Sequence, residues 1–404
     1  MGLKVVVIGA GQAAAAFAAR LVDLVPDAAI TIVGDEPSAP YQRPPLSKKY
    51  MTGEMSADRL LLRPLEWYAD HRIAMRTGVR AEAIRPAEAV VRLADGEELA
   101  YDRLLIATGA SPRRLPAAIG GDLAGVYTLR TLADADAMAH EFHPGRRALI
   151  VGGGYIGLEA AAVAATLGLD VHLAEMAPRI LQRVAAPQTS DYFRALHAGH
   201  GVKVLENVRL ARLVGQSGRV ARAEFADGVA LDIDFVLVGI GIAPNTALAE
   251  AAGLAIDNGI AVDLSCRTSD ERIHAAGDCA SFEFGGRRIR LESVQNAIDQ
   301  AEAAAAAIAG QAVEYRPVPW FWSDQYDVKL QIAGLNLGHD NVVVRPGARP
   351  GAQSVWYHRG EEFLAVDAMN DPRSYMFGKR LLEAGRNVTP AQAADPAFDL
   401  KTLL

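Results

Sequence analysis

Residues 148–159 read Ala-Leu-Ile-Val-Gly-Gly-Gly-Tyr-Ile-Gly-Leu-Glu, an apolar run followed by glycines at the G-x-G-x-x-G spacing. An alanine-rich helical run follows, so this stretch predicts the first strand, turn and helix of a dinucleotide-binding unit. Gly152 would allow the tight turn, Gly154 the close approach of a pyrophosphate, and Gly157 the packing of helix on strand. The pyrophosphate would lie at the helix N-terminus, where N–H groups and the dipole favour negative charge.

An acidic residue follows at the distance that such a unit requires. Glu175 comes 21 residues after Gly154, at the end of the next apolar run. A carboxylate there can accept hydrogen bonds from both ribose hydroxyls of an adenosine and would repel a 2′-phosphate. The site is therefore predicted to bind NAD rather than NADP.

The N-terminus carries a second copy of this pattern. Gly9 and Gly11 follow an apolar run, Ala14 stands in the place of the third glycine, and Asp35 supplies the acid after the next apolar run. One such loop alone could be a tight strand–helix turn without a nucleotide. Two loops, each with an acid, predict two dinucleotides, FAD and a nicotinamide nucleotide.

The composition fits a globular protein of two or three domains, with 404 residues, 50% of them hydrophobic and 22% charged. The net charge of −7 argues against broad nucleic-acid binding. No apolar run approaches the roughly 20 residues of a membrane span. The short apolar run after Lys4 is interpreted as the first strand rather than a signal peptide. We therefore expect a cytoplasmic protein with neither a nucleic-acid nor a membrane partner.

The chain has only two cysteines, Cys266 and Cys279, and no C-x-x-C motif. A flavin disulfide reductase needs a redox dithiol to take electrons from the flavin. Here the flavin would have to pass them to another acceptor, and both thiols are expected to serve only in packing. The nine histidines are scattered without ligand spacing, so no metal site is predicted.

Several other stretches carry candidate contacts or turns. Prolines predict an extended segment at 40–45, with Ser47 capping a short helix after it. Arg43 and Lys48 there could face the phosphates and ring of a flavin, or could simply lie on a solvated loop. Asp-Gly pairs at 95–96 and 227–228 predict hairpin turns.

Further elements are predicted near the nucleotide sites. Buried strands are expected at 102–112 and 235–245, each running into a turn that contains glycine. Thr131 is predicted to cap a helix. Asp278, in a Gly-Asp pair, could hold a ribityl hydroxyl, and the helix amides near Val294 could face the flavin edge.

These patterns predict an α/β fold with two Rossmann-like dinucleotide-binding domains and a C-terminal α+β domain. The FAD domain is expected to be discontinuous, at 1–112 and 239–314. The NAD domain would comprise 113–238. The α+β domain would comprise 315–404, where a Pro- and Trp-rich segment leads into short strands.

With these residues considered together, the chain resembles the NADH-dependent, FAD-containing ferredoxin reductases that serve bacterial cytochromes P450 and aromatic-ring dioxygenases. The likeness covers nearly the whole chain. Its specific segments are residues 9–11, 44–48, 107–109, 152–159, 241–245, 277–279 and 319–325.

The resemblance implies a glutathione-reductase-like fold and a set of cofactor contacts. Contacts to FAD would come from Ala13, Asp35, Arg43, Lys48, Ala81, Arg130, Asp278 and Val294, with Ala81 contributing through its backbone. Contacts to NAD would come from Tyr155, Ile156 and Glu175. Lys48 and Glu159 would form an ion pair beside flavin N5, and Trp322 would lie near the ring on the ferredoxin side.

The resemblance also implies an activity. NADH would deliver a hydride to the flavin, which would pass single electrons to a [2Fe–2S] ferredoxin. One alternative is a reductase of a small oxidant such as a quinone. Another is a protein similar to apoptosis-inducing factor, in which NADH binding sets a conformational state.

A local basic patch near the flavin edge is expected, because the chain is acidic overall and ferredoxins of this class are acidic too. The candidates for this patch are Arg59, Arg63, Arg316, Lys329 and Arg345.

Overall fold

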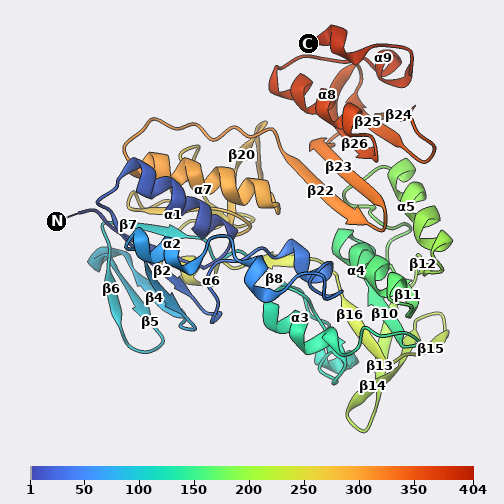
Figure 1. Ribbon diagram of the computed structural model, residues 1–404, viewed down its shortest axis with the longest axis horizontal. Helices are drawn as coiled ribbons and strands as arrows, with labels where there is room; N and C mark the ends of the chain where they lie inside the picture. Colours follow the sequence, from blue (N-terminus) through green and yellow to red (C-terminus); the bar gives the residue numbers. More distant parts are fainter. Residues whose placement is uncertain (1) are drawn as a thin grey trace. The chain divides into compact units, whose positions relative to one another are not determined.

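The computed structural model describes residues 2–404 and divides the chain into two compact units (Figure 1). The first unit comprises residues Met1–Gln42, Ser56–Ser111 and Ile242–Pro317, and the second comprises Arg43–Met55, Pro112–Gly241 and Val318–Leu404. Each unit is described by itself below. The three-domain division expected from the sequence stays a prediction.

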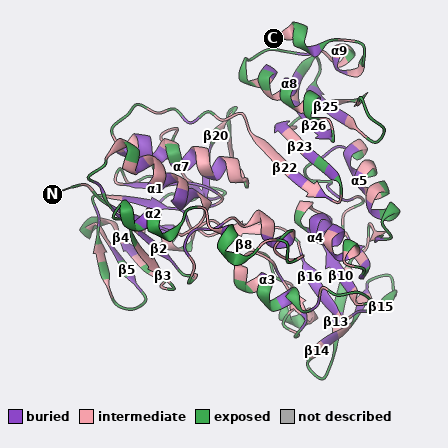
Figure 2. Ribbon diagram, viewed as in Figure 1, coloured by how far each residue is buried: buried purple, intermediate pink, exposed green. Residues whose placement is uncertain are grey.

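The first unit is built on a five-stranded parallel sheet in the order β19-β7-β1-β2-β3. Its strands are β1 (Lys4–Ile8), β2 (Ala29–Gly34), β3 (Ala74–Thr77), β7 (Arg103–Ile106) and β19 (Ile273–Ala275). Helix α1 (Gln12–Leu24) joins β1 to β2 and packs against α7 (Val294–Ile308). The middle strands are buried almost throughout, as expected for a parallel sheet covered on both faces (Figure 2).

The second unit contains a parallel sheet of the same design, in the order β12-β11-β10-β16-β9. Its strands are β9 (Val126–Tyr127), β10 (Arg147–Val151), β11 (Asp170–Ala174), β12 (Lys203–Leu205) and β16 (Phe235–Val238). Helices α3 (Leu132–Ala139), α4 (Tyr155–Thr166) and α5 (Pro187–Gly199) accompany it. The second unit therefore repeats the strand–turn–helix start of the first, which confirms the predicted pair of Rossmann-like folds.

A three-stranded antiparallel sheet follows β3 in the first unit and β12 in the second. One consists of β4 (Ala81–Arg85), β5 (Val90–Leu93) and β6 (Glu98–Ala100). The other consists of β13 (Leu210–Gln216), β14 (Arg219–Phe225) and β15 (Ala230–Asp232). The Asp-Gly pairs at 95–96 and 227–228 connect the last two strands of each sheet, so both predicted hairpins are confirmed.

The C-terminal part of the second unit is an antiparallel sheet with two helices, which confirms the α+β prediction. The strand order is β22-β23-β26-β25-β24. The elements are β22 (Trp320–Gln325), β23 (Val328–Gly334), β24 (Asn341–Pro346), β25 (Gln353–Arg359), β26 (Glu362–Met369), α8 (Pro372–Glu383) and α9 (Pro390–Ala394). Trp356, Phe363 and Phe377 form the core between sheet and helices.

The remaining elements are short. The strands are β8 (Ala110–Pro112), β17 (Ile242–Pro244), β18 (Ile260–Ala261), β20 (Ala280–Phe284) and β21 (Arg287–Ile289). The helical elements are α2 (Leu65–Asp70), α6 (Ala247–Ala251), η1 (Pro44–Ser47), η2 (Ala57–Leu60), η3 (Pro86–Glu88), η4 (Ala117–Ile119) and η5 (Leu400–Leu403).

Three local predictions were wrong. The apolar run at 102–112 is not one strand, because it breaks after Ile106 and Ala110–Pro112 forms the separate strand β8, with Gly109 between them at a φ of 65°. Ser47 is the last residue of η1 rather than its cap, because the two prolines occupy the first helical positions, where a fixed φ and a missing N–H are tolerated. The apolar run at 235–245 is not one strand. It breaks after Val238 at glycines, of which Gly241 has a positive φ of 100°, and Ile242–Pro244 forms the separate strand β17. The predicted cap at Thr131 is confirmed, since its side chain accepts from the backbone N–H of Asp134.

Candidate nucleotide sites and a buried ion pair

The glycine loop of the second unit has the form that a pyrophosphate requires. A Cβ on Gly152 would lie 2.4 Å from the carbonyl oxygen of Gly239, and a Cβ on Gly157 would lie 2.0 Å from that of Gly152. A Cβ on Gly154 would meet no atom within 4 Å. No side chain caps helix α4, so its first amides are available to an anion.

Glu175 follows β11 and is fixed beside this loop. Its carboxylate accepts hydrogen bonds from the backbone N–H groups of Gly153 and Ala177, each at 2.7 Å. Each carboxylate oxygen keeps a further lone pair for a ribose hydroxyl. Sequence reasoning missed Gly153, where a Cβ would lie 2.6 Å from Ile180 Cγ2 and 3.2 Å from Glu175 Oε2. The third consecutive glycine was the signal that could have found it.

The first unit has a corresponding loop. Gly9 has a φ of +110°, and a Cβ there would lie 2.1 Å from the carbonyl oxygen of Ala107. A Cβ on Gly11 would meet nothing within 4 Å, and helix α1 begins without a side-chain cap. Ala14, in the third position, is fully buried, so this helix packs on its strand with a methyl group between them.

Other predicted FAD residues of the first unit gather near that loop. A Cβ on Gly277 would lie 3.5 Å from Cβ of Ala13 and 3.7 Å from Cβ of Ala297, so Asp278 adjoins both α1 and the first turn of α7. That turn begins at Val294, after the capping residue Ser293.

Asp35, the predicted acid of the first loop, does not occupy the position that corresponds to Glu175 in the second loop. Val33 pairs with Ile8, as Ala174 pairs with Val151, so Gly34 is the counterpart of Glu175 and Asp35 lies one residue further along. Asp35 is exposed at this edge of the sheet, and Ala81 begins β4.

A buried ion pair lies in the second unit. Lys48 Nζ lies 2.5 Å from Glu159 Oε2, and the exposed fractions of the two side chains are 19% and 9%. Ser323 Oγ donates to the other carboxylate oxygen, at 2.8 Å, and Ser47 Oγ approaches Oε2 at 3.4 Å. The ion pair expected from the resemblance is present. Because burying two charges costs several kcal/mol per ion unless they are well paired, this pair suggests a functional role.

The segment that supplies Lys48 also brings two predicted FAD contacts together. Arg43 precedes η1, and its guanidinium donates to the backbone carbonyl of Arg130 at 2.8 Å. Arg130 itself lies just before helix α3. Within the second unit, the segment that carries Lys48 is therefore in direct contact with Arg130.

Tyr155 and Ile156, the predicted NAD contacts at the start of α4, differ in how far their side chains are exposed. The Tyr155 ring packs on Phe321, with ring centroids 4.9 Å apart, and its hydroxyl is buried without a hydrogen-bond partner among residues 2–404. Burial raises the pKa of Tyr155 well above its ordinary value. Ile156, by contrast, is 47% exposed. Trp322 lies on the neighbouring strand β22, half-buried, with its ring 5.7 Å from that of Trp320.

Asp367 is a buried carboxylate near Tyr155 that links helix α5 to the C-terminal sheet. Asp367 is 1% exposed and accepts hydrogen bonds from the hydroxyls of Tyr357 and Thr189. Burial raises its pKa from 3.8 to about 6. In the unfolded chain the same carboxyl would titrate near its ordinary value, so the folded state binds the proton more tightly.

We expect an Asp367→Asn variant to be less sensitive to pH than the wild type. The stability contributed by the Asp367 proton is complete below pH ~4 and is lost as the pH rises through about 6. A difference of about two units between the folded and unfolded pKa values corresponds to about 3 kcal/mol, which is the largest pH-dependent change in the free energy of unfolding that Asp367 could cause. Chemical denaturation at pH 4.5 and 7.5 would measure it. Equal pH dependence of both proteins would contradict the assignment.

Both cysteines are buried and unpaired. Burial raises the pKa of each thiol. Cys279 Sγ contacts the carbonyl oxygens of Ala276 and Ile106. The thiols therefore pack within the first unit and are not poised as thiolates.

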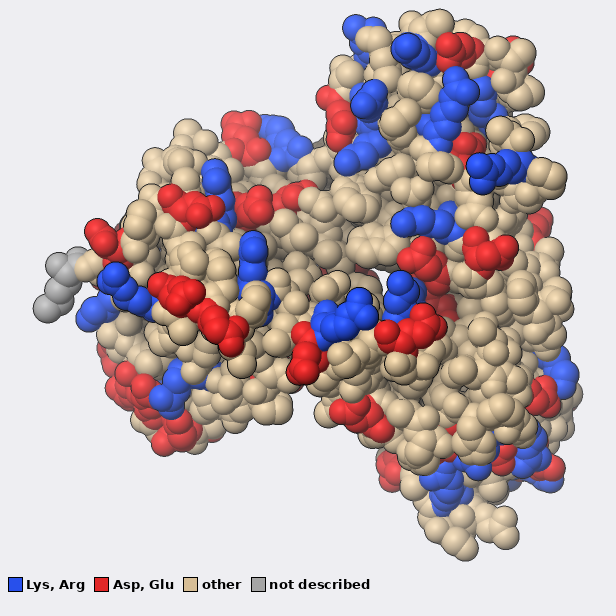
Figure 3. Space-filling model, in the orientation of Figure 1, with Lys and Arg blue, Asp and Glu red and all other residues tan. Residues whose placement is uncertain are grey.

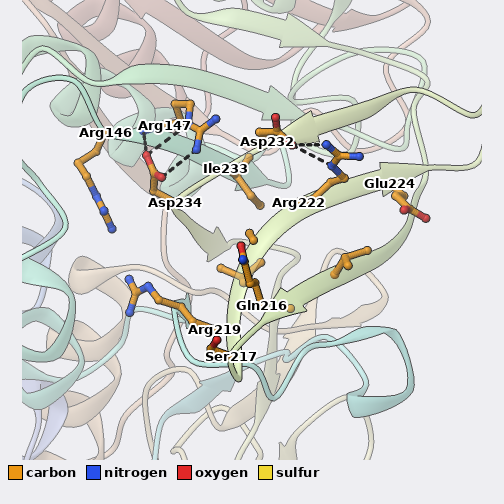
Figure 4. Close-up of a pocket in the computed structure, with 14 residues that line it drawn as sticks. Arg146, Arg147, Gln216, Ser217, Arg219, Arg222, Glu224, Asp232, Ile233 and Asp234 are labelled. Carbon is orange, nitrogen blue, oxygen red and sulfur yellow. Dashed lines mark hydrogen bonds and ion pairs between the residues drawn. The ribbon is translucent and has the colours of Figure 1, made fainter.

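A pocket of about 770 Å³ in the second unit lies away from these residues (Figure 4). Its arginines face acids: Arg147 pairs with Asp234, and Arg222 pairs with Asp232. Arg147 begins β10, so this pocket lies at the N-terminal edge of the sheet. Nucleotides bind at the opposite, carboxyl edge of such sheets.

Fold and sites together define a class of protein. Two Rossmann-like folds each present a glycine turn and an uncapped helix start, and a buried lysine–glutamate pair accompanies them. This is the design of a flavoprotein that works with a pyridine nucleotide. No helix among residues 2–404 has the length and apolar character needed to cross a membrane.

The chain belongs to the pyridine nucleotide-disulphide oxidoreductase family, whose model matches residues 3–301. Residues 320–404 match the reductase C-terminal family.

Relatives of known identity extend over the whole chain. A ferredoxin–NAD(P)(+) reductase of Sphingomonas sp is 43% identical over 99% of this chain and 97% of its own. Rhodocoxin reductase of Rhodococcus erythropolis is 42% identical over 99% of this chain and 94% of its own. The solved structure of the covalent putidaredoxin reductase–putidaredoxin complex matches with a TM-score of 0.95 and 38% identity, covering 99% of this chain and 97% of that one.

Proposed function

We propose that this protein is an FAD-dependent NADH:ferredoxin oxidoreductase that supplies electrons to a cytochrome P450 or an aromatic-ring dioxygenase. The observation that carries the proposal is full-length likeness to ferredoxin reductases, at 43% identity over 404 residues for the Sphingomonas relative. A cytoplasmic location belongs to the proposal, because the reaction consumes NADH.

The residues present fit both nucleotides. In the first unit, the loop at Gly9 and Gly11, with Ala13, Asp35, Ala81, Asp278 and Val294, would bind FAD. Arg43, Lys48 and Arg130 are FAD contacts that the family resemblance implies. The loop at Gly152 and Gly154, with Tyr155, Ile156 and Glu175, would hold NADH. When bound, FAD supplies the conversion between the two-electron donor NADH and a one-electron acceptor.

The chain's own residues would bind and orient the reactants. Glu159 neutralises Lys48 and fixes its ammonium group, so the pair presents a defined charge distribution in a partly dehydrated site. The open space beside Gly154 and the fixed Glu175 would set the position of the dinucleotide along α4. Proximity and orientation would then supply most of the acceleration.

The surface around Trp322 offers a place for an acidic [2Fe–2S] ferredoxin. Lys379, on α8, lies over the Trp320 ring, with Nζ 5.2 Å from its centroid, and Trp320 adjoins Trp322. Lys329, on β23, is exposed. On the face shown in Figure 3, the charged side chains of the C-terminal part are more often basic than acidic.

Not every arginine expected in the basic patch is available for docking. Arg345 donates to five backbone carbonyls, those of Gln392, Ala393, Asp395, Pro396 and Phe398, and so closes the C-terminal end of α9. Arg59, Arg63 and Arg316 belong to the first unit, whereas Trp322 belongs to the second. The docking proposal therefore rests on Lys329 and Lys379 of the second unit, although Lys379 Nζ also lies 3.5 Å from the Glu383 carboxylate.

Reversing both charges in K329E/K379E should slow ferredoxin reduction and flatten its dependence on salt, because long-range attraction to the acidic partner is lost. Ferricyanide reduction should stay near the wild-type rate, since a small ion needs no docking surface. The double variant K203E/R212E, with the same change in net charge on β12 and β13, is the control. Rates would be measured between ~10 mM salt, where the Debye length is ~30 Å, and ~0.15 M, where it is ~8 Å.

Three outcomes would count against the proposal. Wild-type ferredoxin reduction slower than quinone reduction would favour a reductase of small oxidants. Slow flavin reoxidation by every protein acceptor would favour an NADH-sensing role. Equal slowing of both acceptors by K329E/K379E would contradict the docking surface.

A further inference from the structure

The Lys48–Glu159 ion pair is the end of a longer hydrogen-bonded chain that runs through the second unit. Ser323 Oγ donates to Glu159 Oε1 at 2.8 Å, and Gln325 Nε2 donates to Ser323 Oγ at 3.2 Å. His197 Nε2 and Gln325 Oε1 are 2.8 Å apart, and the Tyr326 hydroxyl lies 3.2 Å from His197 Nδ1. Glu159, Ser323, Gln325 and His197 are all buried.

Chemistry fixes the direction of every hydrogen bond in this chain. A carboxylate only accepts, so Ser323 must use its one proton on Glu159 and accept from the Gln325 amide nitrogen. The Gln325 oxygen then faces His197 and also only accepts, so the proton of His197 lies on Nε2. His197 Nδ1 is left to accept from Tyr326. All donors therefore point towards the carboxylate.

The histidine is suited to this fixed arrangement. Burial lowers the pKa of His197 to about 4, so the ring is neutral near pH 7 and one nitrogen donates while the other accepts. His197 lies in the last turn of α5, whereas Ser323 and Gln325 lie two residues apart on the same face of β22. This series of hydrogen bonds thus connects α4, β22 and α5.

The turn that follows β22 provides an independent observation. Tyr326 has a φ of +55°, a conformation that costs a bulky residue free energy and that glycine or asparagine adopts more easily. Yet the tyrosine places its hydroxyl on His197 and stacks its ring on His200, with centroids 3.7 Å apart. The positive φ of Tyr326 is therefore compensated by side-chain contacts that fix His197, at the far end of the hydrogen-bonded series, in place.

We propose that Ser323, Gln325 and His197 are positioning residues that hold the Glu159 carboxylate in the orientation in which it pairs with Lys48. Without the hydroxyl of Ser323, Glu159 Oε1 loses its donor and the carboxylate can rotate away from Lys48. The inference rests on the proposed function, in which this ion pair adjoins the flavin. It assigns to the Trp-Ser-Asp-Gln segment of β22 a role beyond that of Trp322.

The test compares Ser323→Ala with Ser354→Ala in the FAD-loaded protein. Ser354 is also a fully buried serine of the C-terminal sheet, where it accepts from Trp356 Nε1 at 3.0 Å, so both variants orphan one buried donor. Ser323→Ala should lower the rate constant of flavin reduction by NADH about 10- to 100-fold, the same order as the loss seen when a hydrogen-bond partner that orients a metal ligand is removed. The Kd for NADH should change by less than about twofold in both variants. Gln325→Leu should act in the same direction as Ser323→Ala.

A second measurement does not depend on turnover. The denaturation midpoints of the wild type, Ser323→Ala, Glu159→Gln and the double variant form a double-mutant cycle. Since a hydrogen bond to a charged acceptor is stronger than one to a neutral acceptor, Ser323→Ala should shift the midpoint more when Glu159 is present. Additive midpoints, or flavin reduction in Ser323→Ala as fast as in Ser354→Ala, would overturn the inference. Failure of NADH to reduce the wild-type flavin would instead refute the proposed function and leave the cycle interpretable.

Discussion

A Glu159→Gln variant should reduce its flavin with NADH about 10²- to 10³-fold more slowly than the wild type, the usual cost of removing one preorganised electrostatic group. The introduced amide cannot neutralise Lys48, whose ammonium group lies 2.5 Å from the carboxylate in the native protein. The variant should also be less stable, because one charge of a largely buried pair is left without its partner. The double variant K48M/E159Q should recover stability but not the rate.

Anaerobic stopped-flow absorbance of the flavin would measure this rate directly. Glu141→Gln is a matched control, because Glu141 is a fully buried carboxylate of the same unit that pairs with Arg146 and Arg219. Its loss should lower stability without slowing flavin reduction. If Glu159→Gln reduced its flavin as fast as Glu141→Gln, the ion pair would be structural only.

The features that could be predicted from the sequence are those that a short stretch of chain determines. The turn at Gly152 requires a positive φ, and the hairpins at 95–96 and 227–228 require turn residues, so each leaves a local signal. The cap at Thr131 is local for the same reason. The two Rossmann-like folds follow from such signals together with apolar runs between them.

The residues that tertiary packing brings together left no such signal. Lys48 and Glu159 are 111 positions apart, and His197 and Gln325 are 128 apart. The ion pair was expected only from the family resemblance, and the chain behind it was not expected at all. Ser47 is a different case, because the two prolines before it are a local signal that the helix begins at Pro44 and that Ser47 lies inside it.

The basic patch shows the same limit at the surface. A sequence shows that Arg345 is charged but not that its guanidinium is enclosed by the carbonyls after α9. Burial lowers the pKa of Arg345, in keeping with a structural position. Lys379 was not considered, because only the fold brings α8 against Trp320.

For nucleotide choice, kcat/KM should be about 100-fold or more higher with NADH than with NADPH. The Glu175 carboxylate is held by two backbone N–H groups, so it cannot swing away from a 2′-phosphate. A phosphate carries about −1.5 to −2 charges near pH 7, and like charges at a contact cost several kcal/mol.

Glu175→Ala should shrink that preference by about 10- to 100-fold, mainly by lowering kcat/KM for NADH, because the partner of the ribose hydroxyls and the anchor of Gly153 are removed together. Asp35→Ala is the control. Asp35 stands at the edge of the other parallel sheet, so its loss should weaken FAD retention while leaving the ratio of NADH to NADPH unchanged. Initial rates with ferricyanide give both values of kcat/KM without involving the ferredoxin. If Asp35→Ala changed the ratio and Glu175→Ala did not, the two nucleotide sites would have to be exchanged between the units. If neither changed it, the choice of nucleotide would depend on residues other than these two acids.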